Sequence, residues 1–81
     1  MKIKILGVGC SRCKRLEENV KKLVLENNID TEIEKVTDIQ EMMKYGILAT
    51  PGLVINEKLK SSGILPKDKQ VLAWIQEESG I

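Results

Sequence analysis

An apolar run gives way to a helical pattern within Gly7-Val8-Gly9-Cys10-Ser11-Arg12-Cys13-Lys14-Arg15. Both cysteines of the chain lie in this stretch. A spacing of three residues places two side chains about one helical turn apart on nearly the same face. The two sulfurs can therefore meet if the first cysteine lies at the start of the helix. This spacing favours redox chemistry of a dithiol.

The two cysteines are expected to have different roles. Cys10 is predicted at the N-terminal edge of the helix, where free backbone N–H groups and the helix dipole favour the nucleophilic thiolate. Ser11, Arg12 and Lys14 are predicted to tune the pKa of its thiol. Cys13 lies deeper and is expected to be more shielded. Cys10 would then attack a disulfide of the partner, and Cys13 would resolve the mixed disulfide.

Three other uses of the cysteine pair stay open. A zinc site normally takes four ligands, and the chain has no histidine and no third cysteine, so zinc would need a dimer-bridging site. A structural disulfide over so short a loop would constrain the unfolded chain little. A soft-metal carrier is the main alternative, because two thiolates suit monovalent copper.

Length and composition restrict the class of protein. The 81 residues predict a single domain over 1–81, with an aliphatic core because Phe is absent and Trp and Tyr occur once each. The net charge of +1, with both signs interleaved, argues against a nucleic-acid partner. The short, interrupted apolar start predicts no signal peptide, and no segment is long enough to span a membrane. We expect a cytoplasmic monomer with no membrane partner.

Apolar periodicity and turn residues predict alternating strands and helices. In chain order they are a strand over 2–8, a helix from Ser11 to about Asn27, a charged edge strand over 31–36, a short helix between Asp38 and Gly46, an apolar strand through Leu53-Val54-Ile55, a strand from Lys58 to Ile64 and a helix starting at Pro66. The first strand, helix and strand should form a right-handed parallel unit, to which the later hairpin adds antiparallel strands. The result is an α/β fold with a mixed four-stranded sheet and helices on both faces.

Local signals refine two of these elements. Asp38 and Glu41 have the spacing of a capping box for the short helix. Met42 and Met43 are interpreted as core filler. Asn56-Glu57 is predicted to form a tight turn between the last two strands.

The order of elements resembles the minimal thioredoxin or glutaredoxin fold, because C-x-x-C opens the first helix and Thr50-Pro51 precedes the third strand. The likeness covers nearly the whole chain and is closest to the small redox-active disulfide proteins of archaea and bacteria. It implies β-α-β-α-β-β-α topology and a thiol-disulfide oxidoreductase. No bound cofactor is implied beyond a redox-active disulfide between Cys10 and Cys13.

The same resemblance assigns roles outside the cysteine pair. Pro51 is expected to follow a cis peptide bond, to lie against the two sulfurs and to help keep metal from the dithiol. The main chain of Thr50 is expected to pair with an extended substrate segment by β-augmentation. The implied partners are a disulfide-containing protein and an electron-donating reductase or small thiol.

The chain departs from the family pattern at several positions. Thioredoxins usually have an aromatic residue before the first cysteine and Gly-Pro between the two, where this chain has Gly9 and Ser11-Arg12. Redox potential and partner choice therefore stay open. Many thioredoxins bury an acid six residues before the first cysteine, where this chain has Lys4, which is expected at the surface. Glutathione-binding residues are not identified.

Two rival functions make different structural predictions. A copper carrier with a ferredoxin-like βαββαβ fold needs two successive strands after the first helix, and usually Met or His where this chain has Val8. A thioredoxin-like interaction module with an incidental dithiol would have a weakly reactive Cys10.

Overall fold

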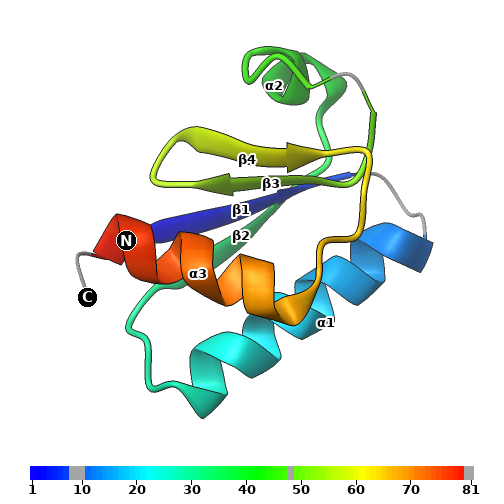
Figure 1. Ribbon diagram of the computed structural model, residues 1–81. Coiled ribbons are helices and arrows are strands. Elements are labelled where there is room, and N and C mark those ends of the chain that lie inside the picture. The colour runs from blue at the N-terminus through cyan, green and yellow to red at the C-terminus, as the bar shows by residue number, and fades with distance from the viewer. Residues whose placement is uncertain (8–10, 48, 80–81) are drawn as a thin grey trace.

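The computed structural model describes residues 1–7, 11–47 and 49–79 (Figure 1). In chain order its elements are β1 (Lys2–Leu6), α1 (Ser11–Glu26), β2 (Glu32–Val36), α2 (Ile39–Met43), β3 (Gly52–Ile55), β4 (Lys58–Ser62) and α3 (Asp68–Ser79). The predicted β-α-β-α-β-β-α order is confirmed.

The four strands form one mixed sheet in the order β2-β1-β3-β4. β1 runs parallel to β2 and antiparallel to β3, and β4 runs antiparallel to β3. Helices α1 and α3 lie on one side of the sheet and α2 lies on the other (Figure 1). A ferredoxin-like fold would need two successive strands after α1, but α2 lies between β2 and β3. The fold predicted for the rival copper carrier is therefore wrong.

The larger part of the core lies between the sheet and the helix pair α1 and α3. Alternate residues of the central strands point to this side because successive side chains of a strand face opposite ways. Helix α1 presents an inward stripe at helical spacing. The buried residues of this cluster are Ile3, Ile5, Leu16, Val20, Leu23, Leu53, Ile55, Val71 and Ile75.

A smaller core lies under α2. It consists of Leu6, Val54 and Met42, with Tyr45 among the partly buried side chains around it. Met43 is 68% exposed, so its interpretation as core filler is wrong. A helix of this length makes little more than one turn, and Met42 already occupies the side that faces the sheet.

The predicted capping box at α2 is only half formed. The carboxylate of Asp38 accepts the N–H of Gln40 at 2.8 Å, as an N-cap should. Glu41 does not complete the reciprocal bond. Its side chain accepts a hydrogen bond from Lys44 instead, at 2.9 Å.

Two predicted boundaries after the hairpin need correction. β4 ends at Ser62 rather than Ile64, because Gly63 adopts a φ of +78°. The last helix begins at Asp68 rather than Pro66. Pro66 is buried in the preceding loop, and the carbonyl of Lys67 accepts the first main-chain bonds of the helix.

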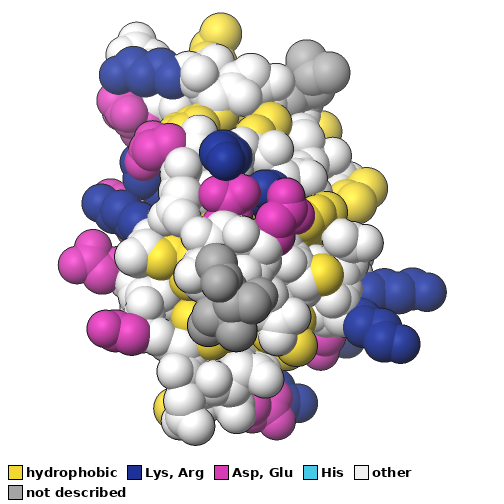
Figure 2. Space-filling model, turned by 60° about the vertical axis from the view of Figure 1, so that its left-hand side comes forward, with side chains coloured by type: hydrophobic (Ala, Val, Ile, Leu, Met, Phe, Trp, Pro, Cys, Tyr) yellow, Lys and Arg dark blue, Asp and Glu magenta, His cyan; other side chains and the backbone are white. Residues whose placement is uncertain are grey.

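Charged side chains of both signs cover the outside. Figure 2 shows acidic and basic groups interspersed on the face that it displays, without an extended patch of one sign among the coloured residues. Of the helices described here, none is long and apolar enough to cross a membrane.

One ion-pair cluster joins α3 to β4. The side chain of Glu78 is only 8% exposed and lies 2.8 Å from Lys60 Nζ and 3.3 Å from Lys58 Nζ. The hydrogen bond from Lys60 lowers the pKa of Glu78 below its ordinary value near 4.5, although burial acts in the opposite direction.

We expect Glu78→Gln to destabilise the fold near neutral pH and to have little effect in acid. A carboxyl with a lowered pKa in the folded state stabilises above its unfolded pKa, and this contribution is lost as pH falls through the folded pKa. The free energies of unfolding of variant and wild type should therefore differ most at neutral pH and converge only as pH falls through the lowered pKa of Glu78. Chemical denaturation across this range measures the difference, with Glu77→Gln on the exposed side of α3 as control. A constant difference at all pH values would contradict the ionic origin of the effect.

Candidate active site

Two neighbouring segments and a third that is distant in sequence meet at Gly7, directly after β1. A Cβ atom built on Gly7 would collide with Sγ of Cys13, and would lie 3.0 Å from Cys13 Cβ and 3.8 Å from Thr50 Cβ. The end of β1, the first turn of α1 and the loop before β3 therefore converge. Only glycine leaves room for this approach, because any side chain would occupy the position of the Cys13 sulfur.

Cys13 faces inward from α1. Its side chain is 1% exposed, and it is not a free thiol in this structure. A macromolecular partner therefore has no direct access to its sulfur. Cys10, the predicted nucleophile, lies outside the described residues, as do Val8 and Gly9.

The peptide bond between Thr50 and Pro51 is cis, as the family resemblance predicted. Pro51 is buried at the start of β3, and Thr50 is half-buried. The position of Thr50 beside Gly7 places this segment next to the segment that carries Cys13.

The end of β4 holds the residues on either side of Thr50. The Ser62 hydroxyl donates to the carbonyl of Ala49 at 3.1 Å, and it lies 3.4 Å from the main-chain nitrogen of Ala49, whose N–H it accepts. The N–H of Gly63 donates to the carbonyl of Pro51 at 2.9 Å. Within the described ranges, neither main-chain group of Thr50 has a hydrogen-bond partner. Both groups are therefore available to a strand that adds alongside.

Positive charge gathers at the start of α1. Ser11, Arg12 and Lys14 are exposed there, and the first turn of the helix has no acidic residue. Together with Arg15 and Glu18 they line a surface hollow of about 280 Å³. Among the residues that the structure describes, neither Arg12 nor Lys14 forms an ion pair.

Lys4 is not the surface residue that the sequence suggested. Its side chain is 17% exposed, donates to the Tyr45 hydroxyl at 2.6 Å and lies 3.0 Å from the carboxylate of Glu57. The Tyr45 hydroxyl in turn donates to Glu57 at 2.7 Å. The bond to Tyr45, reinforced by Glu57, raises the pKa of Lys4 above its ordinary range. Lys4 thus stays protonated and cannot take a proton from a thiol.

Two residues of this site, Gly7 and Ser62, were not identified by sequence reasoning. Gly7 lies in the stretch with the cysteines, but its contact with Thr50 depends on the pairing of β1 with β3. Ser62 carries no motif that marks it. Its role follows only from where β4 ends relative to Ala49.

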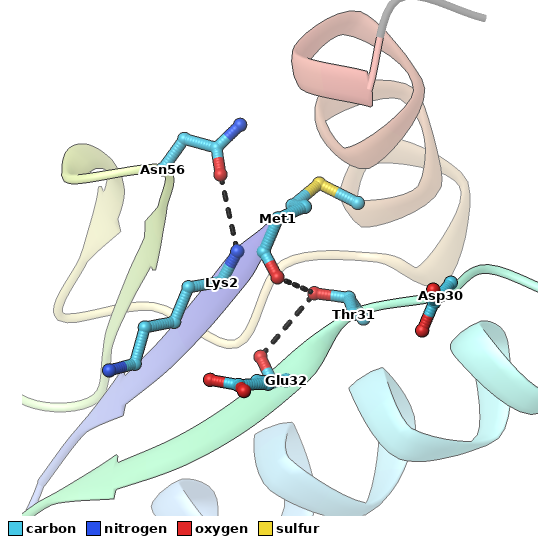
Figure 3. A pocket seen from close by; sticks show the side chains of 6 residues that line it. All are labelled: Met1, Lys2, Asp30, Thr31, Glu32 and Asn56. Atoms are coloured by element: carbon cyan, nitrogen blue, oxygen red, sulfur yellow. Dashed lines mark hydrogen bonds between the residues drawn. The ribbon is translucent and has the colours of Figure 1, made fainter.

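A separate cavity lies at the N-terminal end of β1, the end opposite to Gly7 (Figure 3). Its lining residues are Met1, Lys2, Asp30, Thr31, Glu32 and Asn56. The dashed bonds in Figure 3, from Lys2 to Asn56 and from Thr31 to the carbonyls of Met1 and Glu32, join β1, β2 and the hairpin turn. Within the described residues, no group of three or more potential metal ligands occurs there or elsewhere.

Comparison with known proteins gives one consistent family. Residues 1–76 match the family model described as a thioredoxin domain. A thioredoxin of Methanothermobacter thermautotrophicus is 37% identical over 71 residues, which cover 88% of this chain and 92% of that protein. A thioredoxin of Methanocaldococcus jannaschii is 39% identical over 69 residues, or 85% of this chain and 79% of that protein. The family match includes Gly7, Cys13 and the Thr50–Pro51 segment.

Proposed function

Because the chain belongs to the thioredoxin family, we propose that it is a thiol-disulfide oxidoreductase whose dithiol consists of Cys10 and Cys13. The observation that carries this proposal is the meeting of Cys13, Gly7 and the Thr50–cis-Pro51 segment at one point. A buried cysteine beside unpaired main-chain groups suits a reaction with a disulfide in an extended peptide.

The reaction has two exchange steps. The thiolate of Cys10 attacks one sulfur of the substrate disulfide, which forms a mixed disulfide and releases the other sulfur as a thiolate. Cys13 then loses its proton and attacks the sulfur of Cys10, which releases the second substrate thiol. The substrate gains two electrons and the protein is left with the Cys10–Cys13 disulfide. An electron-donating reductase or a small thiol restores the dithiol.

The roles of the two cysteines follow from their expected access. Cys13 is buried on the inner side of α1, which suits an intramolecular second step. Cys10 precedes the first residue of α1, where the helix dipole and the nearby Arg12 and Lys14 favour its thiolate. Ser11 adds a hydroxyl group at the first residue of α1. These three residues are proposed to speed the first step.

Thr50 and Pro51 are proposed to bind the substrate. An extended segment can hydrogen-bond to the unpaired N–H and C=O of Thr50, as strands do when they add to a sheet edge. Pro51 would hold this segment beside the dithiol. We propose a disulfide-containing protein as substrate and the reducing cytoplasm as the location, where dithiols are kept reduced.

We expect the dithiol to close in a single two-electron transition when the protein is equilibrated in dithiol redox buffers. Known oxidoreductases of this kind have potentials that place the midpoint between roughly −180 and −290 mV. The mass shift after alkylation of free thiols, measured on metal-free protein, gives the reduced fraction at each potential. A dithiol that stays reduced across this range and binds monovalent copper tightly would support the metal carrier instead.

A further inference from the structure

Ala49 is attached to β4 by hydrogen bonds that are not part of the strand pairing. Main-chain pairing between β3 and β4 ends at Gly52 and Ser62, so Ala49 lies beyond the ladder. A hydroxyl can both donate and accept, and the Ser62 side chain uses both capacities on the two main-chain groups of Ala49. A side chain thus continues the attachment where the strand pairing stops.

The neighbouring glycine brings the two segments close. Gly63 has a φ of +78°, and a Cβ atom at this position would lie 3.0 Å from the Cβ of Ala49. Its N–H also bonds to the carbonyl of Pro51. Ser62, the last residue of β4, and Gly63 after it therefore hold the two neighbours of Thr50, while Thr50 itself has no main-chain partner in the described part of the chain.

We propose that Ser62 is a positioning residue for substrate binding: its hydroxyl holds Ala49 so that the main-chain groups of Thr50 point toward an incoming strand. The inference rests on the proposed function and adds to it a residue that sets the substrate preference. Ser62 gives the protein a preference for disulfides in extended polypeptide segments over small disulfides without a peptide main chain.

The preference has a physical origin in preorganisation. A strand can pair with Thr50 only when the N–H and C=O groups of Thr50 have one particular orientation. Any conformational freedom of the loop that carries Thr50 must be lost when the strand binds. The Ser62 bonds remove that freedom before binding. A small disulfide reaches the dithiol without using Thr50, so its reaction does not depend on the orientation of the loop.

The test compares Ser62→Ala with Ser62→Thr, which keeps the hydroxyl, and with Ser61→Ala. Ser61 is a matched control because it is the adjacent serine of β4, and its buried hydroxyl has no hydrogen-bond partner among the described residues. One substrate is an extended ten-residue peptide with a single cysteine in disulfide linkage to a chromogenic thiol. The other is 2-hydroxyethyl disulfide.

Ser62→Ala should raise KM for the peptide about fivefold with little change in kcat, since one modest hydrogen-bonding contribution is lost. The rate constant with 2-hydroxyethyl disulfide should stay within twofold of the wild type. Ser62→Thr should restore most of the peptide affinity, and Ser61→Ala should behave like the wild type with both substrates.

Two outcomes would overturn the inference while the proposed function stands. An unchanged KM for the peptide in Ser62→Ala would show that the hydroxyl does not position Thr50. Equal losses with both disulfides would show a general structural role. A wild-type protein that reduces neither disulfide would overturn the proposed function, and the inference with it.

Discussion

Replacing Cys10 by serine should lower the rate of disulfide reduction on the order of a thousandfold or more, to the level of the buffer background. Serine cannot form the thiolate that opens the substrate disulfide, and the buried sulfur of Cys13 has no direct access to a protein substrate. The loss should be the same with peptide and protein disulfides. Turnover retained in Cys10→Ser would rule out the proposed mechanism.

Cys13→Ser should fail at the second step instead of the first. The mixed disulfide between Cys10 and the substrate then persists, because the thiol that resolves it is missing. Intact-mass measurement should find protein plus one substrate molecule, released by dithiothreitol. The double variant Cys10→Ser/Cys13→Ser should capture nothing, which shows that capture depends on the remaining thiol.

Gly7→Ala should lower both the stability of the fold and the rate of the second exchange step, because it places a methyl group where the sulfur of Cys13 lies. Overpacking of a buried site costs about 1–3 kcal/mol of the free energy of unfolding. Displacement of the Cys13 sulfur should also slow release of the mixed disulfide by up to about a hundredfold. Chemical denaturation measures the loss of stability. Samples quenched rapidly with acid measure the rate at which the mixed disulfide is released.

A double-mutant cycle separates this collision from any general effect of alanine at Gly7. In a Cys13→Ala background the colliding sulfur is absent, so Gly7→Ala should cost less by about 0.5 kcal/mol or more. All four proteins are compared in excess dithiothreitol, so that no disulfide contributes to stability. Additive effects of the two substitutions would contradict direct contact between Gly7 and Cys13.

The sequence predicts the elements that have strong periodicity. The inward stripe of α1, the apolar strand β3 and the hairpin after it each follow from local patterns. The order of the elements, with C-x-x-C at the start of the first helix and Thr50-Pro51 before the third strand, is sufficient to indicate the family. Boundaries near proline and glycine are less well predicted, because Pro66 suits both a first helical turn and the loop before it.

What the sequence does not predict depends on contacts between distant residues. Lys4 looks like an ordinary charged position of an alternating strand, yet its side chain contacts Tyr45, which is 41 positions further along the chain, and Glu57, which is 12 positions beyond Tyr45. Ser62 has its role only because β4 ends beside Ala49. Met43 follows Met42 directly, and only the rotation of α2 determines which of them is buried.

The sheet order also has a consequence for synthesis of the chain. β1 is central, and its Ile3 pairs with Ile33 of β2 and with Ile55 of β3. Pairing of the first strand therefore requires closure of long loops, which slows folding. On the ribosome, the segment with both cysteines emerges well before the Thr50 segment, which lies close to Cys13 at Gly7 in the folded chain. The thiol of Cys13 is thus exposed to solvent during that interval, whereas its side chain is buried in the folded chain.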